Sequence, residues 1–387
     1  MTARWVVAQE GCWTMLKVPD ATISIKQTRL SFLFGNAISG YILNSTAYQN
    51  WFAARFKYTV FENEMKWYFN EQTCGIVDYS ITDAMLQFAK SHEIAVHGHT
   101  VLWEDRLGHP TWLGDFPLNR SEEYRQLTDS SVNYVMNRYK GEVFHWDVVN
   151  ENMHHWFIKE RIGENSFAIY YKKVHEIDPD ALLFLNEYMT LEKSSDQRAS
   201  TWMYLRNIWE IREQGASKGT LGGIGPTDEP LVALLAQGRP FLDLGALQGH
   251  FYPMNLPYVR ASIDVLDSVK LPIWVTELDV NNKMGPDQAN RLDQVIRELH
   301  AHHVVQGILM WSAILLEGDV VDKFIAEWTH SFGLEGKTDS NGYFETSLFH
   351  DQYEATLRLG KKPILQKFEV APNGDGKHEE VFFKICV

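Results

Sequence analysis

The chain has 387 residues, of which 45% are hydrophobic, and its formal net charge is -14 at pH 7. This length suits one large α/β barrel with appendages or several ordinary domains. The acidic balance argues against nucleic acid and anionic membranes as partners, because proteins that bind them concentrate Lys and Arg. A neutral polymer remains a possible partner, because the flat rings of the 13 Trp and 16 Tyr can stack on sugars. Most of these rings are nevertheless expected to pack in the core.

The sequence gives little information about the cellular compartment of the protein or its redox state. Three cysteines (Cys12, Cys74 and Cys386) are too few for a disulfide framework and lack paired metal-ligand spacing. No run approaches the roughly 20 apolar residues of a membrane span, and no apolar export signal follows Met1. We therefore expect a chain that is either cytosolic or without its original start. Sequons at Asn44 and Asn119 are compatible with secretion.

The first residues resemble pieces of β-strand at 5–8 and 12–16, and residues 1–20 are expected to be the remnant of a preceding module or a linker. Eight apolar runs follow, each nearly continuous, as in strands of a parallel sheet covered on both faces. They are 32–37, 58–62, 94–98, 143–149, 182–186, 244–249, 272–277 and 307–311.

Segments of helical periodicity separate these runs. Examples are the sets Ile81, Met85, Phe88 and Ala89; Phe167, Tyr170, Tyr171 and Val174; and Leu292, Val295, Ile296 and Leu299. Eight strand–helix units predict an α/β fold, a (β/α)8 TIM barrel, over residues 21–330. An open doubly wound sheet would carry a Gly-rich phosphate loop, and none is present in the sequence. Residues 331–387 alternate in the manner of strands and predict a small β-rich C-terminal tail.

Polar residues end six of the predicted strands. They are Glu62 and Asn63; His97 and His99; Asn150 and Glu151; Asn186 and Glu187; Gln248 and His250; and Glu277 and Asp279. Any single pair suits a helix cap or a turn. Six pairs at equivalent positions instead predict an active site, because the carboxyl ends of all barrel strands meet on one face.

Glu151 and Glu277 end the fourth and seventh predicted strands. Two carboxyls across a barrel mouth suit glycosidic cleavage, in which one donates a proton and the other meets an oxocarbenium-like carbon. A metal-assisted hydrolase is the rival interpretation, using His97, His99 and His250 with these carboxyls. The Trp and Asn residues around the site favour a sugar over a hydrated ion, so no metal is expected.

Four motifs carry a family resemblance. They are FENEMKW at 61–67, GHTVLW at 98–103, WDVVNE at 146–151 and WVTELD at 274–279. Together they resemble glycoside hydrolase family 10, the endo-β-1,4-xylanases, from about residue 23 to about residue 323. Three further segments resemble the plant branch of the family, in which carbohydrate-binding modules precede the barrel. They are CWTML at 12–16, AYQNWF at 47–52 and WED at 103–105. Residues 1–20 would then be the end of such a module.

The resemblance implies a retaining double displacement on xylan and xylo-oligosaccharides, without a cofactor. Glu277 would be the nucleophile with a low pKa, held ionised by His250, and Glu151 the acid/base with a raised pKa. Asn150 would bind the sugar 2-hydroxyl. The other implied sugar contacts are Glu62, Asn63 and Lys66 on the glycone side; His99, Trp103 and Gln248 beside the cut; Trp311 as an aromatic wall; and Tyr188 and Tyr252 against aglycone sugars. The substrate implies a cell-wall, extracellular location.

Two features depart from the family pattern. Glu104 and Arg106 stand where many microbial members have His and Gln, and the loop after Trp311 is short and lacks a second Trp over residues 314–320. Because this loop is short, a barrel that binds a glycan with little or no hydrolysis remains an alternative interpretation. A retaining hydrolase of another β-glycan, such as a glucan or mannan, is the further alternative.

Overall fold

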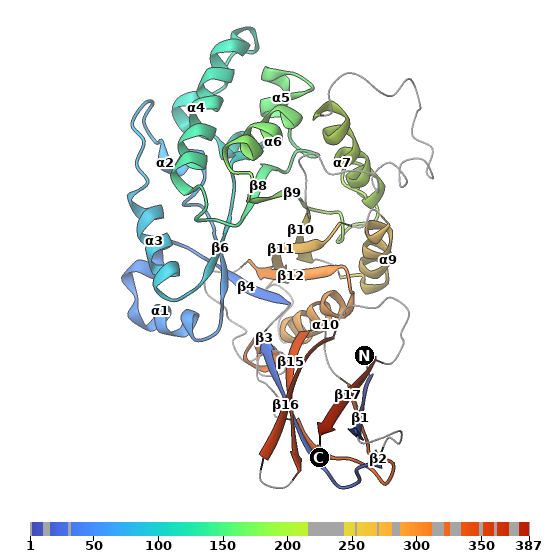
Figure 1. Ribbon diagram of the computed structural model, residues 1–387. Coiled ribbons are helices and arrows are strands. Elements are labelled where there is room, and N and C mark those ends of the chain that lie inside the picture. Colours follow the sequence, from blue (N-terminus) through green and yellow to red (C-terminus); the bar gives the residue numbers. More distant parts are fainter. Residues whose placement is uncertain are drawn as a thin grey trace. The chain divides into compact units, whose positions relative to one another are not determined.

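The structure is a computed structural model of the 387-residue chain. It describes residues 2–10, 16–29, 32–215, 244–251, 254–268, 271–280, 287–311, 321–325, 334–347, 351–359, 362–370 and 379–386. The chain divides into two compact units, one from Phe34–Leu316 and the other from Met1–Leu33 together with Glu317–Val387. Figure 1 labels their elements, and each unit is described by itself.

Eight strands close the larger unit into a barrel. Their order is β4, β5, β6, β8, β9, β10, β11, β12 and back to β4, and a short strand, β7 (Leu102–Trp103), pairs with β8. The bounds are β4 (Leu33–Ile38), β5 (Tyr58–Phe61), β6 (Ala95–Gly98), β8 (His145–Asn150), β9 (Leu182–Glu187), β10 (Leu244–Phe251), β11 (Ile273–Val280) and β12 (Val305–Met310). Each lies on one of the eight predicted apolar runs, so the predicted (β/α)8 barrel is confirmed.

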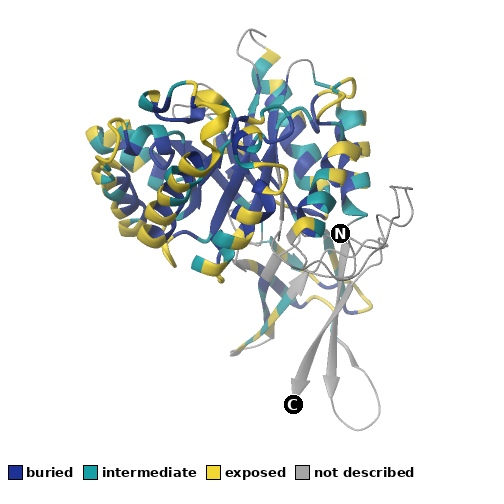
Figure 2. Ribbon diagram, turned by 90° about the horizontal axis from the view of Figure 1, so that it is seen from above, coloured by how far each residue is buried: buried dark blue, intermediate teal, exposed yellow. Residues whose placement is uncertain are grey.

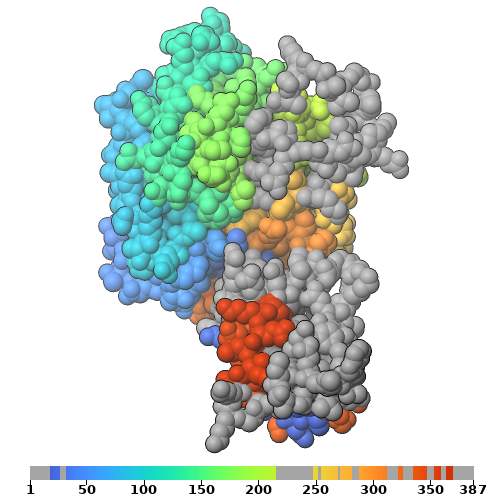
Figure 3. All heavy atoms as spheres, in the orientation of Figure 1, coloured from blue at the N-terminus to red at the C-terminus, as the bar shows by residue number. Residues whose placement is uncertain are grey.

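Helices follow the strands along the chain and surround the barrel in Figure 1. They are α1 (Thr46–Ala53), α2 (Trp67–Asn70), α3 (Ser80–Ser91), α4 (Ser121–Tyr139), α5 (Phe157–Ile162), α6 (Ser166–Ile177), α7 (Thr201–Gly215), α9 (Leu256–Asp267) and α10 (Gln288–Ala301). In Figure 3 the blue to green part of the chain forms a continuous surface on the face shown. Within the described ranges, no helix has the length and apolar character needed to cross a membrane.

The helical periodicity predicted from sequence matches the buried faces. All four predicted positions are buried in α6 and in α10, whereas in α3 Ile81 is exposed and the other three are buried. Figure 2 shows the barrel strands as mostly buried and the outer helix faces as mostly exposed. This inward gradient is the one expected when amphipathic helices cover a sheet that is apolar on both faces.

Two glycines allow large indole rings to fill the barrel. A Cβ on Gly98 would lie 2.2 Å from the Trp146 ring, and one on Gly307 would lie 2.6 Å from the Trp274 ring. Both Trp side chains are almost fully buried. The barrel interior is therefore a packed core, and its strand ends form a firm base for polar side chains.

The described strands of the smaller unit form two sheets made from both ends of the chain. In one, β1 (Thr2–Glu10) pairs with β2 (Leu16–Lys17), β14 (Tyr343–Ser347) and β17 (Glu379–Cys386). In the other, β3 (Thr22–Arg29) lies between β13 (Leu334–Lys337) and β15 (Asp351–Leu359), and β16 (Lys362–Val370) pairs with β15. Ile23, Ile25, Ala355 and Leu357 belong to its buried apolar cluster.

The predicted β-rich tail is confirmed, but the predicted boundaries differ from those of the structure. The sequence interpretation separated residues 1–20 from 331–387 and gave residues 22–29 to the barrel. The structure instead pairs β1 and β3 with C-terminal strands, for example Trp5 with Phe344. Local patterns predict strands but not partners hundreds of residues away. That residues 1–20 derive from a carbohydrate-binding module stays a prediction.

Candidate active site

Glu151 follows the last residue of β8 and is oriented by an unusual backbone conformation. Its φ is 57°, in the left-handed region, where a non-glycine residue costs roughly 1–3 kcal/mol. Its backbone N–H donates to the carbonyl oxygen of Asn186 on the adjacent strand β9 (3.0 Å). Such strain persists only where the surroundings hold it, and it gathers at functional sites.

Neutral groups hold the Glu151 side chain. The Trp103 indole N–H donates to Oε2 (2.8 Å), and the Gln248 amide donates to Oε1 (3.1 Å). The side chain is 14% exposed, and His155 Nε2 lies 3.8 Å from Oε2. Both oxygens of this carboxyl are therefore engaged by fixed donors at the carboxyl ends of the strands.

Glu277 on β11 is more deeply buried and lies among cationic groups. Its side chain is 7% exposed, and its Oε2 is 3.6 Å from His250 Nε2. Oε1 accepts a hydrogen bond from the Asn186 amide (2.7 Å) and is 3.9 Å from His99 Nε2. Burial alone would raise the pKa of Glu277, but the hydrogen bond from His250 and the charges of His99 and Lys66 outweigh burial and lower this pKa.

His250 connects the two carboxyls. Burial would lower the pKa of His250, but its bonds to Asp279 and Glu277 raise it to about 10, so the ring is protonated at neutral pH. Its Nδ1 lies 3.0 Å from Asp279 Oδ2. From Nε2 it donates to Gln248 Oε1 (3.2 Å), and the Gln248 amide in turn reaches Glu151. Gln248 and His250 thus form a chain of contacts between Glu151 and Glu277.

Aromatic rings and a buried ammonium line the other side of the site. Lys66 Nζ lies 4.6 Å above the Trp103 ring centre and 5.8 Å from that of Trp311. His99 meets the Trp311 ring edge-on at 5.3 Å. Burial lowers the pKa of Lys66, while the charge of Glu277 opposes that change without cancelling it. The amino group of Lys66 is thus buried beside two aromatic rings.

The site depends on buried polar residues that the sequence interpretation did not select. Asn186 donates to Asn150 (2.8 Å) as well as to Glu277, and it accepts from Thr276 (2.7 Å). Asp147 holds His99 Nδ1 at 2.7 Å. Asn186 had been noted as a strand end, and Asp147 is an acidic residue inside an apolar run. An acidic residue within an apolar run was the available signal for Asp147, because a buried carboxylate requires hydrogen-bond or charge partners.

His97 and His99 are both committed to Asp147. His97 Nε2 lies 2.9 Å from the same Asp147 oxygen that contacts His99. Burial would raise the pKa of Asp147, but the two imidazoles hold it far below the usual range. The His-x-His spacing that favoured a metal in the rival interpretation is thus explained by a shared carboxylate.

The remaining predicted residues are placed around this core. Glu62 follows β5, and its charge acts on Lys66. Asn63 accepts a hydrogen bond from the Tyr68 hydroxyl (2.6 Å). Tyr188 follows β9, stacks on His154 with ring centres 3.9 Å apart, and has its hydroxyl 3.4 Å from His155. Tyr252 and the short loop at 314–320 lie outside the described residues.

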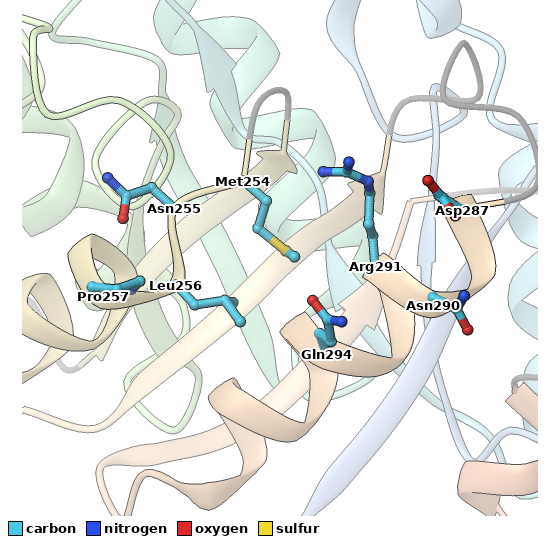
Figure 4. A pocket seen from close by; sticks show the side chains of 8 residues that line it. All are labelled: Met254, Asn255, Leu256, Pro257, Asp287, Asn290, Arg291 and Gln294. Atoms are coloured by element: carbon cyan, nitrogen blue, oxygen red, sulfur yellow. The ribbon is translucent and has the colours of Figure 1, made fainter.

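A separate pocket of about 780 Å³ lies between the start of α9 and the first half of α10. Figure 4 shows Met254 and Asn255 on one side of it and Arg291 with Asp287 on the other. None of the predicted site residues lines it. It is distinct from the cluster built around the two carboxyls.

A (β/α)8 barrel with two differently held carboxyls, amides and aromatic rings at its strand ends has the architecture of glycoside hydrolases. The chain belongs to glycosyl hydrolase family 10, whose family model matches residues 24–315. The resemblance inferred from the four motifs is confirmed.

Individual relatives agree with this assignment. The chain is 36% identical over 362 residues to endo-1,4-beta-xylanase 5 of Arabidopsis thaliana, covering 88% of this chain and 59% of the relative. It is 33% identical over 389 residues to endo-1,4-beta-xylanase 4 of the same plant, covering 92% of this chain and 64% of the relative. The chain thus spans about six tenths of the length of these relatives. Native xylanase 10B of Thermotoga maritima has a similar fold, with a TM-score of 0.60 at 19% identity, covering 77% of this chain and 97% of the other.

Proposed function

We propose that this protein is a retaining endo-β-1,4-xylanase in which Glu277 is the nucleophile and Glu151 the acid/base. One observation carries the assignment of roles. Glu277 is buried among cationic groups that lower its pKa, whereas the hydrogen bonds to Glu151 come from the neutral groups of Trp103 and Gln248. A nucleophile must stay ionised, and an acid/base must be able to hold and release a proton. The xylanase names of the Arabidopsis relatives support the substrate.

The first chemical step breaks the glycosidic bond. A Glu277 carboxylate oxygen attacks the anomeric carbon, the bond from that carbon to the leaving oxygen breaks, and the Glu151 carboxyl gives its proton to that oxygen. A covalent xylosyl ester on Glu277 results, and Glu151 is left as a carboxylate. Donors that fix Glu151 help this step, because a proton must arrive as the bond breaks.

The second step returns the enzyme to its starting state. The Glu151 carboxylate takes a proton from water, whose oxygen attacks the anomeric carbon and displaces Glu277. The product keeps its anomeric configuration after two inversions. The positive charge of His250, which Asp279 also favours, stabilises the carboxylate of Glu277 as it leaves. The reaction needs only carboxyls and water.

The surrounding groups are proposed to position the sugar. Asn150, fixed by Asn186 at 2.8 Å, would bind the 2-hydroxyl of the reacting xylose. Lys66, with Glu62 and Asn63 nearby in the chain, would bind glycone hydroxyls, and Trp311 would cover the apolar sugar face. Tyr188 lies toward Glu151 and His155, which suits an aglycone platform. A plant cell wall is the location that this substrate implies.

Sugar release tests the proposal. The wild type, Glu151→Ala and Glu277→Ala are incubated with xylan, carboxymethyl cellulose and mannan, and an exposed-residue variant, Glu123→Ala, serves as a control. We expect short xylo-oligosaccharides from xylan alone, with release abolished by both site substitutions and unchanged in the control. Release of sugar from the other polymers but not from xylan would refute xylan as the substrate. No release at all, with xylan still retarding the protein in an affinity gel, would identify a glycan-binding barrel.

A further inference from the structure

A second set of potential ligands adjoins Glu151. Asp105, Glu151 and His155 each present one donor atom, and the three atoms lie within 4.8 Å of one another. His155 Nε2 is 3.5 Å from Asp105 Oδ2 and 3.8 Å from Glu151 Oε2. We call these three residues the His–carboxylate cluster. Asp105 directly precedes η2 (Arg106–Gly108), His155 lies shortly before α5, and Glu151 is the proposed proton donor itself.

The spacing of the cluster suits a small tetrahedral metal ion. Bonds of about 2.0–2.1 Å from Zn²⁺ to nitrogen and oxygen ligands imply ligand atoms roughly 3.3 Å apart at tetrahedral angles. The two distances measured from His155 Nε2, 3.5 and 3.8 Å, are close to that value. All three atoms lie within 4.8 Å of one another, so side-chain movement would bring them together on one ion. Three protein ligands would leave the fourth position to water.

Neighbouring groups already orient the carboxylates. Asp105 uses Oδ1 to accept the backbone N–H of Leu107 (2.9 Å), which leaves Oδ2 toward His155. Glu151 is fixed by Trp103 and Gln248. Such outer contacts hold ligands in position and strengthen metal binding. Among the described residues, His155 is the one ion-pair partner found within 4 Å of the Asp105 or the Glu151 carboxylate. The two carboxylates therefore have a single imidazole between them.

We propose that the His–carboxylate cluster is an inhibitory site for a divalent transition-metal ion of the Zn²⁺ class. An imidazole together with two carboxylates favours such ions over Mg²⁺ and Ca²⁺, which prefer all-oxygen sites. The bound ion would occupy Glu151 Oε2 and so prevent Glu151 from carrying the proton. The inhibition rests on the proposed function, whereas the binding of the ion does not.

Calorimetric titration with Zn²⁺ tests the binding. The wild type and Glu277→Ala, which keeps the whole cluster, are compared with His155→Gln and Asp105→Asn. His302→Gln is the matched control, because His302 also contacts a carboxylate, Asp264 (3.0 Å), outside the cluster. We expect one Zn²⁺ site in the wild type, Glu277→Ala and the control, and binding weakened roughly tenfold or more in the two cluster variants. Mg²⁺ should produce no comparable heat.

Inhibition is measured separately as xylan hydrolysis at increasing Zn²⁺, relative to each variant's own metal-free rate, with reversal by a chelator. The wild type and His302→Gln should be inhibited at the same Zn²⁺ concentration, and His155→Gln should require roughly tenfold more or a still higher concentration. The proposal is overturned if the wild type does not bind Zn²⁺, or if both cluster variants bind it unchanged. Zn²⁺ binding at the cluster without any xylan hydrolysis would refute the proposed function alone.

Discussion

Glu277 and Glu151 are the same residue type at the ends of two barrel strands, yet their surroundings differ. Glu277 is 7% exposed, has His250 Nε2 at 3.6 Å and His99 Nε2 at 3.9 Å, and has a lowered pKa. Glu151 is 14% exposed and is bonded by the indole of Trp103 and the amide of Gln248. The barrel thus places two carboxyls at its strand ends in different electrostatic surroundings.

The comparison teaches that the role of a carboxyl is set by the charge and burial around it. Burial alone would push Glu277 toward the protonated form. At Glu277 the nearby cations reverse that tendency, which suits a group that must attack as an anion. At Glu151 the indole of Trp103 and the amide of Gln248 fix the geometry of the carboxyl group.

Replacing Glu277 by Ala should abolish hydrolysis. Without the attacking carboxylate no covalent intermediate forms, so kcat on xylan should fall by roughly 10⁴-fold or more. The loss should be as large for an aryl xylobioside with an activated leaving group, because the nucleophile is needed whatever the leaving group. Steady-state kinetics on both substrates measures this, with thermal unfolding to show that the variant is folded. Residual activity near the wild-type level would remove Glu277 from the mechanism.

Replacing Glu151 by Ala should give a smaller loss that depends on the substrate. General acid catalysis contributes about 10²–10⁴-fold, so xylan hydrolysis should fall by that factor. Bond cleavage in an activated aryl xylobioside needs no proton, and its kcat/KM should fall about tenfold or less. An equal loss on both substrates would contradict the assigned role. Glu123→Ala, at an exposed position, is the control.

Particular residues show how much of this site could be predicted from the sequence. The eight strands were found because strands buried on both faces form continuous apolar runs, and Glu151 and Glu277 stood out at the ends of two of them. Asn186 was seen as a strand end, but its bonds to Asn150 and Glu277 depend on which strands are neighbours.

The pairing of the chain ends was not predictable for a related reason. Trp5 lies opposite Phe344, and Ile25 lies opposite Ala355, yet no local signal connects positions so distant in the sequence. The lowered pKa of Glu277 was expected from the family resemblance. The part of His250 in lowering it was expected from the same resemblance, whereas the contributions of His99 and Lys66 became clear only in three dimensions.

Replacing His250 by Asn should move the acidic limb of the pH profile. His250 lowers the pKa of Glu277, and its removal lets that pKa rise, so Glu277 becomes protonated and inactive at a higher pH than in the wild type. The kcat/KM for an aryl xylobioside, measured across pH, should therefore start to fall earlier on acidification. In the wild type, activity should also decline as His250 loses its proton at about pH 10. An unchanged acidic limb would mean that His250 does not control Glu277.

Replacing Trp103 by Phe should have the smallest effect of the four substitutions. The change removes one hydrogen bond to Glu151 and keeps an aromatic ring beneath Lys66, so a loss of about tenfold in kcat/KM on xylan is expected. The activated aryl xylobioside should be nearly unaffected. Trp112→Phe is a matched control, since that indole donates to the carbonyl of Glu71 (2.6 Å). Equal losses in both Trp variants would point to stability instead of the acid/base.

Capture with azide distinguishes the chemical role proposed for Glu277 from the one proposed for Glu151. An activated aryl xylobioside is incubated with azide and either variant, and the anomeric configuration of the glycosyl azide is read by NMR. Glu277→Ala should yield the α-azide, because azide replaces the nucleophile in a single inversion. Glu151→Ala should yield the β-azide, because azide intercepts the covalent intermediate. The reverse assignment, or the same anomer from both variants, would contradict the account.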